Sequence, residues 1–148
     1  MGNKTVDIIS AIFTQFLIYF MEIEYLKIED IDEAYKFINK FSKEVGFVIK
    51  PSFYDKINKK ESIIIKDNDK IIALCNFHKR KDNISVIYEI AVDKEYRNQG
   101  LAKKMIRFLI EKGHNIILKC PVDNESNNFY KNIGSKFLGT IKGKKRDL

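Results

Sequence analysis

A short segment at residues 97–102 combines residue types that can bind an anion. It reads Arg-Asn-Gln-Gly-Leu-Ala and follows the apolar run 84–92, at the point where a helix is expected to begin. The first N–H groups of a helix lack intrahelical partners and carry partial positive charge, and small side chains let a pyrophosphate approach them closely. The segment therefore predicts a phosphate cradle. Because a strand, a glycine turn and an amphipathic helix also occur in proteins that bind no phosphate, a purely structural role stays open on this pattern alone.

Glu89 is a candidate acid–base residue because it lies in the strand that leads into the cradle. A carboxylate at that place could act as a general base, directly or through water, whereas the alternative is an exposed residue paired with a lysine. His78 and His114 are weaker candidates, expected near a strand end and in a turn. Cys75 and Cys120 have no CxxC spacing and no nearby histidine pair, so no metal site is predicted, and a buried thiol explains Cys120 better than a reactive one.

The chain alternates between two periodicities from residue 22 onward. Residues 22–28 alternate as a strand does, and Asp30 with Glu33 forms a cap-like D-x-x-E before a helical pattern that runs to Phe41. A second short helix is expected over residues 52–58. The first part of the domain is thus predicted to be a strand followed by two helices.

Three β-rich runs separated by turn residues come next and predict an antiparallel meander. An apolar helical face then begins at Leu101 and ends in a basic turn followed by Gly113. The β-rich runs are 61–66, 71–78 and 84–92, and the elements after the helix are a strand at 115–120, a helix at 124–133 and a strand at 136–142. This order predicts an α/β (α+β) fold with a mixed, mostly antiparallel central sheet and helices on both faces.

Two motifs in the expected order carry a resemblance to a known family. Residues 97–102 match the Q/R-x-x-G-x-G/A signature of the GNAT superfamily of N-acyltransferases, and residues 90–96 resemble its usual lead-in. Residues 124–134 resemble the N-x-x-x-x-F-Y-x-x-x-G element of the same family. The resemblance covers about residues 22–142 and implies a single acetyltransferase domain over 22–148.

The resemblance implies that acetyl-CoA is the acyl donor. The backbone of the cradle would bind its pyrophosphate, with Gly100 as the least replaceable residue. Strands 84–92 and 115–120 would splay apart, so that the freed backbone pairs with the pantetheine arm as an added strand would. Asn124 would hydrogen-bond the cofactor, cap the following helix, or do both. The implied cofactor-binding residues are Ile90, Ala91, Val92, Arg97, Asn98, Gln99, Gly100, Leu101, Ala102, Asn124 and Tyr130.

Amide formation from a thioester needs a neutral amine, an oxyanion donor and a proton for the departing thiolate. Tyr130 matches the family tyrosine that protonates the coenzyme A sulfur, and its alternative role is that of a core aromatic whose hydroxyl bonds a carbonyl. Glu89 is the candidate base, and a backbone N–H near Val92 is the candidate oxyanion donor. The acceptor is expected to be a primary amine of a small molecule or protein. The competing interpretation is a non-catalytic acyl-CoA-binding sensor.

Composition and charge limit the classes of fold and function that remain possible. A chain of 148 residues with 45% hydrophobic residues suits one compact domain. The formal charge of +7 indicates attraction to anions without saying which anion, and solvated lysines account for much of it. The aromatic residues fall on periodic core positions, so a nucleic-acid partner is not expected. The two separated cysteines favour a reducing, cytoplasmic setting.

The N-terminal extension, residues 1–21, is the segment that the domain pattern does not explain. Its apolar run at 6–21 is shorter than the roughly 20 residues of a spanning helix, and no small-residue cleavage site follows it. We expect a helix buried against the domain or against a partner subunit, which would make the protein a homodimer. Membrane contact through this run is a less favoured interpretation. Alternatively, Met21 is the working start, since the domain pattern begins at Glu22.

Overall fold

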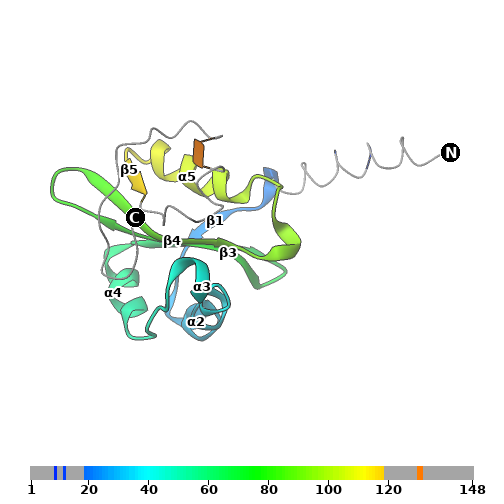
Figure 1. Cartoon of the computed structure of the whole chain (residues 1–148), viewed down its shortest axis with the longest axis horizontal. Coiled ribbons are helices and arrows are strands. Elements are labelled where there is room, and N and C mark those ends of the chain that lie inside the picture. The colour runs from blue at the N-terminus through cyan, green and yellow to red at the C-terminus, as the bar shows by residue number, and fades with distance from the viewer. Residues whose placement is uncertain (1–8, 10–11, 13–18, 119–129, 132–148) are drawn as a thin grey trace.

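The computed structural model describes residues 9, 12, 19–118 and 130–131. Its centre is a five-stranded sheet in the order β1-β2-β3-β4-β5 (Figure 1). Neighbouring strands are antiparallel from β1 to β4, whereas β4 and β5 are parallel, which confirms the predicted mixed sheet. The strands are β1 (Ile23–Tyr25), β2 (Ser62–Asp67), β3 (Lys70–Lys79), β4 (Ile84–Val92) and β5 (Asn115–Leu118).

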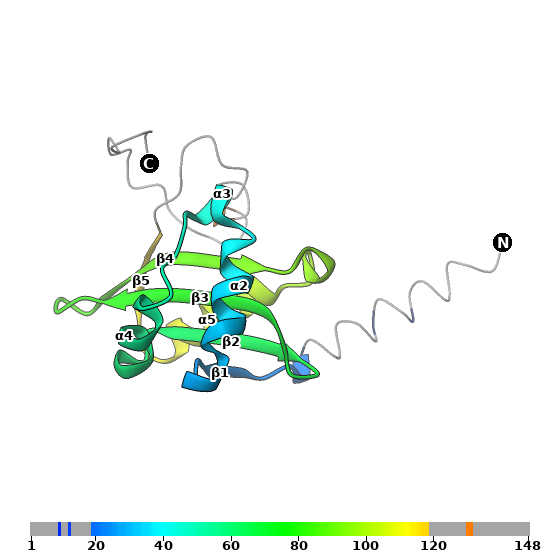
Figure 2. The same cartoon turned by 90° about the horizontal axis from the view of Figure 1, so that it is seen from below.

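Helices cover both faces of the sheet, as predicted. Figure 2 shows α2 (Ile31–Asn39), α3 (Ser42–Val45) and α4 (Ser52–Lys59) in front of the sheet, with α5 (Leu101–Glu111) behind it. Short 3-10 turns, η1 (Ile28–Asp30) and η2 (Lys94–Tyr96), precede α2 and α5. Because α5 crosses over one face between β4 and β5, those two strands can run parallel.

The core has one half on each face of β3. Residues 71–77 of this strand are all buried, as expected for a central strand that is covered on both sides. Apolar side chains of β2, β3 and α5 fill the first half, and side chains of β2, β3, α2 and α4 fill the second. Representative residues are Ile65, Phe77 and Met105 on the α5 face, and Leu74, Phe37 and Phe53 on the opposite face.

The start of α2 differs from the predicted D-x-x-E cap. Asp30 makes no side-chain capping bond, and its carboxylate instead accepts a hydrogen bond from Lys66 Nζ at 2.8 Å. The carboxylate of Glu33 accepts a hydrogen bond from the backbone N–H of Ile71 at 2.6 Å. Both acidic side chains therefore attach α2 to β2 and β3 instead of closing the helix. The helix also ends at Asn39, and the short α3 that follows was not predicted.

Parts of the two ends of the chain are also described. Tyr19 and Phe20 are helical, and both are exposed, as are Ile9 and Ile12. Tyr130 is helical, as predicted for 124–133. Within the described part of the chain, no helix is long and apolar enough to cross a membrane. The rest of the predicted helix 124–133 and the strand 136–142 lie outside the described residues, and the packing of residues 6–21 stays a prediction.

Candidate active site

β4 and β5 pair along only the first part of β4. Their parallel register runs from Ile84 opposite Asn115 to Ile87 opposite Leu118. β4 then continues to Val92, and its other edge stays paired with β3 over this stretch. Among the described residues, no strand pairs with β4 beyond Ile87 on the β5 side. This edge can accept an extended ligand as an added strand. The predicted splay also involves residues 119–120, which lie outside the described part.

A bulge interrupts β4 beside this edge. The register with β3 changes from Asn76 opposite Glu89 to Phe77 opposite Ile87, so Tyr88 has no opposite residue. A bulge of this kind bends the strand and redirects its side chains, and bulges are frequent next to active sites. Here the bulge lies immediately before the residues that were predicted to bind the pantetheine arm. It therefore fixes where the Glu89 side chain points relative to that edge.

Glu89 lies in a largely desolvated place. Burial raises the pKa of its carboxyl above the ordinary value, while the Asn76 amide and the Lys56 ammonium act in the opposite direction. The Oε2 atom of this carboxylate is buried and has no hydrogen-bond partner. The alternative role as an exposed strand residue therefore does not describe Glu89. A carboxylate with a raised pKa is a stronger base than an ordinary one, as proton abstraction requires.

The loop between β4 and α5 is tied to the rest of the domain at several points. The hydroxyl of Tyr96 donates a hydrogen bond to Asp67 at the β2–β3 turn over 2.6 Å, which raises the pKa of Tyr96 to about 12. Arg97 Nε donates to the carbonyl of Val92 at 3.2 Å, and its guanidinium lies 5.5 Å from the centre of the Phe41 ring. The loop that precedes the cradle is thus anchored before any ligand binds.

The start of α5 has the backbone expected of an anion cradle. Asn98 and Gly100 have φ angles of 61° and 89°, in the left-handed region. The first intrahelical bond runs from the N–H of Lys104 to the carbonyl of Gly100 at 2.9 Å, so the three preceding N–H groups lie ahead of the hydrogen-bond ladder. A Cβ on Gly100 would meet nothing within 4 Å. The space above this backbone is therefore open to a ligand.

Tyr130 is half-buried and packs against the core on the α5 face. Glu89 belongs to the other side of the sheet, because its register partner Asn76 lies between Cys75 and Phe77, which both join the α5-side core. The two predicted catalytic residues thus approach from opposite faces. They could serve one reaction only beside an edge of the sheet, and β4 has an unpaired edge beyond Ile87 among the described residues. Asn124 lies outside the described residues.

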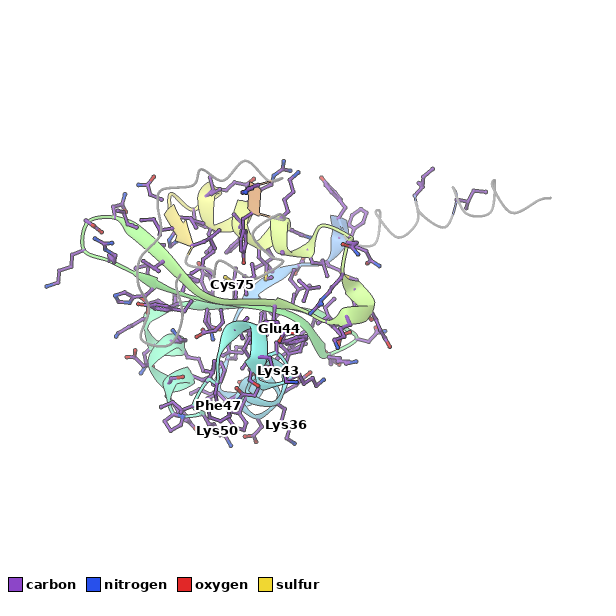
Figure 3. The ribbon with its side chains drawn as sticks, viewed as in Figure 1. Lys36, Lys43, Glu44, Phe47, Lys50 and Cys75 are labelled. Atoms are coloured by element: carbon purple, nitrogen blue, oxygen red, sulfur yellow. The ribbon has the colours of Figure 1, made fainter. Side chains whose placement is uncertain are left out.

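The weaker candidates have structural partners. His78 Nδ1 lies 3.2 Å from Glu61 Oε1, and His114 Nδ1 lies 2.5 Å from the hydroxyl of Ser85. Burial, aided by the charge of Lys79, lowers the pKa of His114. Cys75 is buried in β3 on the side that α5 covers (Figure 3), and desolvation raises the pKa of its thiol, so it is not a reactive nucleophile. Cys120 lies outside the described residues.

Asn76 and Lys56 border the site and were not predicted from the sequence. Asn76 is the one amide inside the apolar run 71–77, and that departure from the pattern is a signal that could have identified it. Lys56 has no such signal, because it is one of many lysines. The described residues contain no group of three or more His, Cys, Asp or Glu side chains that could hold a metal ion.

The geometry agrees with the comparison with known families. The family model described as Acetyltransferase (GNAT) family matches residues 25–134. Because the match spans more than half of the chain, the chain belongs to this family and is an acetyltransferase. No curated protein sequence matches it.

Similar solved structures have the same fold. Ard1 from Thermoplasma volcanium has a TM-score of 0.69 at 17% identity, with 82% of this chain and 86% of that chain covered. Naa50 from Arabidopsis thaliana, in complex with the bisubstrate analogue CoA-Ac-MVNAL, has a TM-score of 0.66 at 19% identity, with 86% and 93% covered. The ribosomal-protein-S18-alanine N-acetyltransferase of Escherichia coli has a TM-score of 0.66 at 20% identity, with 85% and 87% covered.

Proposed function

We propose that this acetyltransferase moves the acetyl group of acetyl-CoA onto a primary amine of a small molecule or protein. The observation that carries the proposal is the continuity between the unpaired edge of β4 and the open start of α5. In coenzyme A the extended pantetheine arm is joined to a pyrophosphate. In the chain the unpaired edge of β4 is followed in the same way by the open start of α5. The coenzyme A analogue in the Naa50 structure supports the same donor.

The donor would be bound mainly through the main chain. Backbone groups of residues 90–92 would pair with the pantetheine arm, and the N–H groups of residues 97–102 would bind the pyrophosphate. Arg97 would add positive charge at the mouth of the cradle. Gly100 would leave the space that the phosphates occupy, since its backbone is open on the ligand side. Asn124 would add a side-chain hydrogen bond, as the family resemblance implies.

Proton transfer would divide between two residues. Glu89 would take a proton from the acceptor ammonium, directly or through water, so that the neutral nitrogen attacks the thioester carbon. A backbone N–H near Val92 would donate a hydrogen bond to the oxyanion of the tetrahedral intermediate. When the carbon–sulfur bond breaks, Tyr130 would give its proton to the departing thiolate. The products are the N-acetylated amine and coenzyme A with a free thiol.

A non-catalytic sensor of acyl-CoA is the competing function. It would need the cradle and the β4 edge but neither proton-handling residue. The partly desolvated carboxylate of Glu89 argues against it, because a charged group in a desolvated place costs stability and a sensor has no use for it.

The test combines a binding and a turnover measurement on the full chain. Acetyl-CoA should raise the melting temperature, because it binds only the folded state. A panel of primary amines, including small polyamines, amino acids and short peptides, should then release coenzyme A thiol from acetyl-CoA. Stabilisation without thiol release from any amine would favour the sensor. The absence of any stabilisation at millimolar acetyl-CoA would contradict both functions.

A further inference from the structure

Three polar residues form a row across the buried middle of the sheet. Ser62 in β2 lies opposite Asn76 in β3, and Asn76 lies opposite Glu89 in β4. Ser62 and Asn76 are 1% and 0% exposed. Directly opposed residues on antiparallel strands have side chains on the same face, with Cβ atoms about 5 Å apart. The row therefore lies on the face opposite α5, with Glu89 at the end nearest the unpaired edge of β4.

The Asn76 amide lies close enough to the Glu89 carboxyl to lower its pKa, yet the polar atoms of this row make no hydrogen bond of normal geometry. They are Ser62 Oγ, Asn76 Oδ1, Asn76 Nδ2 and Glu89 Oε2, and the only other buried side-chain atom of this kind in the described part of the chain is Asp30 Oδ2. Buried polar groups without partners destabilise a fold, so most proteins satisfy or exclude them. Their concentration in one row, ending at the proposed base, indicates a function that offsets this cost.

The side chains of the row can form a chain of hydrogen bonds in which each donor points toward Glu89. The hydroxyl of Ser62 can donate to Asn76 Oδ1, the amide nitrogen of Asn76 can donate to Glu89 Oε2, and the carboxylate can only accept. Glu89 Oε2 is buried, and β4 has no partner on the β5 side beyond Ile87, two residues before Glu89, among the described residues. Small side-chain rotations would close both contacts, since the residues are already in register.

We propose that Asn76 is a positioning residue for Glu89, and that Ser62 in turn orients the Asn76 amide. The proposal rests on the proposed function, in which Glu89 accepts the proton of the acceptor amine. The amide holds one carboxylate oxygen in the interior, which leaves the other free for the amine. A neutral donor suits this place because it stabilises the charged carboxylate less than a direct ion pair would, and therefore preserves its strength as a base.

Other charged or titratable groups near Glu89 do not take this role. Lys56 of α4 reaches over the ring of Tyr88, with its Nζ 5.4 Å from the ring centre, so it acts on the carboxylate at a distance. Cys75, next to Asn76 in β3, belongs to the core on the α5 face, and its thiol is neutral because burial raises its pKa. Among the described residues, Asn76 is thus the uncharged donor directly opposite Glu89.

The test measures the ionisation of Glu89 itself. In the full chain labelled with 13C-glutamate, the side-chain carboxyl signal that disappears in Glu89→Gln is followed against pH. In Asn76→Leu the midpoint of this signal should move to higher pH, because the charged carboxylate loses its donor. Ser62→Ala should move it in the same direction by less. Ser85→Ala removes another buried serine hydroxyl of the same sheet, bonded to His114, and serves as the matched control that leaves the midpoint unchanged.

The outcomes separate this inference from the proposed function. Asn76→Leu keeps the approximate size of the side chain, and its melting temperature is measured first to confirm that it folds. If it does not fold, Ser62→Ala carries the test. An unchanged Glu89 midpoint in both variants would overturn the inference even if Glu89→Gln abolishes thiol release. Conversely, shifted midpoints together with full turnover in Glu89→Gln would overturn only the role of Glu89 as the base.

Discussion

At the scale of single residues, the sheet itself separates the two groups that we propose to transfer protons. Glu89 shares a face with Asn76, whereas Tyr130 packs with the core beneath α5. A base and an acid that touched each other would exchange a proton directly and lose their separate roles. The sheet prevents this contact, and in the proposed function the substrate at the unpaired end of β4 would have to reach both residues. The arrangement therefore suits a reaction in which the attacking amine nitrogen and the departing sulfur lie on opposite sides of the thioester carbon.

Replacing Tyr130 by phenylalanine should lower turnover without weakening donor binding. The ring that packs against the core is kept, while the proton donor is lost. General-acid catalysis is typically worth about 10²–10⁴-fold in rate, so kcat should fall within that range while the affinity for acetyl-CoA is retained. Initial-rate assays would measure kcat, and calorimetric titration would measure the affinity for acetyl-CoA. Acyl donors with more acidic thiols should lose less rate.

Tyr25→Phe is the matched control for the tyrosine experiment. Tyr25 packs against the same core as Tyr130, so both variants remove one hydroxyl from a similar environment. Its kcat should equal that of the wild type. An unchanged kcat in Tyr130→Phe, measured where chemistry limits turnover, would show that solvent protonates the thiolate and that Tyr130 is structural.

The raised pKa of Glu89 also predicts a pH-dependent stability. An acid whose pKa is higher in the folded state than in the unfolded state binds protons more tightly when folded, so folding is favoured at low pH. This contribution is lost as the pH rises from the ordinary glutamate value through the higher folded value. Glu89→Gln removes the charge, and it should therefore raise the melting temperature relative to wild type at pH 8 and have little effect at pH 4. Equal melting temperatures at both values would contradict the desolvation of this carboxylate.

At the scale of elements, the β4–α5 junction is rigid where it leaves the sheet and open where the helix begins. Tyr96, Arg97 and the backbone N–H of Asp93 attach the loop to the β2–β3 turn, to Val92 and to β3. The left-handed residues Asn98 and Gly100 then turn the chain into α5. A site that is formed in advance avoids the entropic cost of ordering a loop on binding. The junction is thus suited to binding phosphates through its main chain.

Gly100→Glu should abolish acetyl-CoA binding, because the side chain and its charge would occupy the approach of the pyrophosphate. It should also cost about 1–2 kcal/mol of stability, since a residue with a Cβ is strained at a φ of 89°. Gly113→Glu is the matched control: Gly113 has the same φ and open space around it, but it follows the far end of α5. The control should lose similar stability and keep donor affinity in a calorimetric titration. Equal affinity of both variants would remove the cradle from the binding site.

Most elements could be predicted because their periodicity reflects local burial, whereas the contacts of the site could not. The run 84–92 is apolar enough to identify a strand, and the structure places β4 over the same residues. The D-x-x-E at Asp30 and Glu33 was interpreted as a cap because sequence spacing does not reveal the neighbouring sheet, which takes both carboxylates. The pairing of Asn76 with Glu89 depends on the bulge at Tyr88, and a register shift of one residue cannot be recognised from the sequence alone.

At the scale of the whole molecule, the domain is a sheet covered on both faces, and four described residues of the N-terminal extension do not belong to its core. Ile9, Ile12, Tyr19 and Phe20 are between 61% and 79% exposed. Lys104 Nζ of α5 donates hydrogen bonds to the carbonyls of Tyr19 and Met21, which attaches the end of the segment to the domain. Several large apolar side chains that are exposed close together in sequence are typical of a surface that another molecule covers.

We predict that the full chain self-associates through its N-terminal segment and that the chain beginning at Met21 does not. Removal of residues 1–20 takes away exposed apolar side chains and the contact of Lys104 with Tyr19, while the contact of Lys104 with Met21 remains. The truncated chain should therefore be monomeric and melt at nearly the same temperature as the full chain. Light scattering across a range of concentrations would measure the mass of each. Replacing both Tyr19 and Phe20 by serine in the full chain tests the apolar contact without shortening the protein, and it should shift the equilibrium toward monomer. A full chain that stays monomeric at every concentration would contradict the prediction.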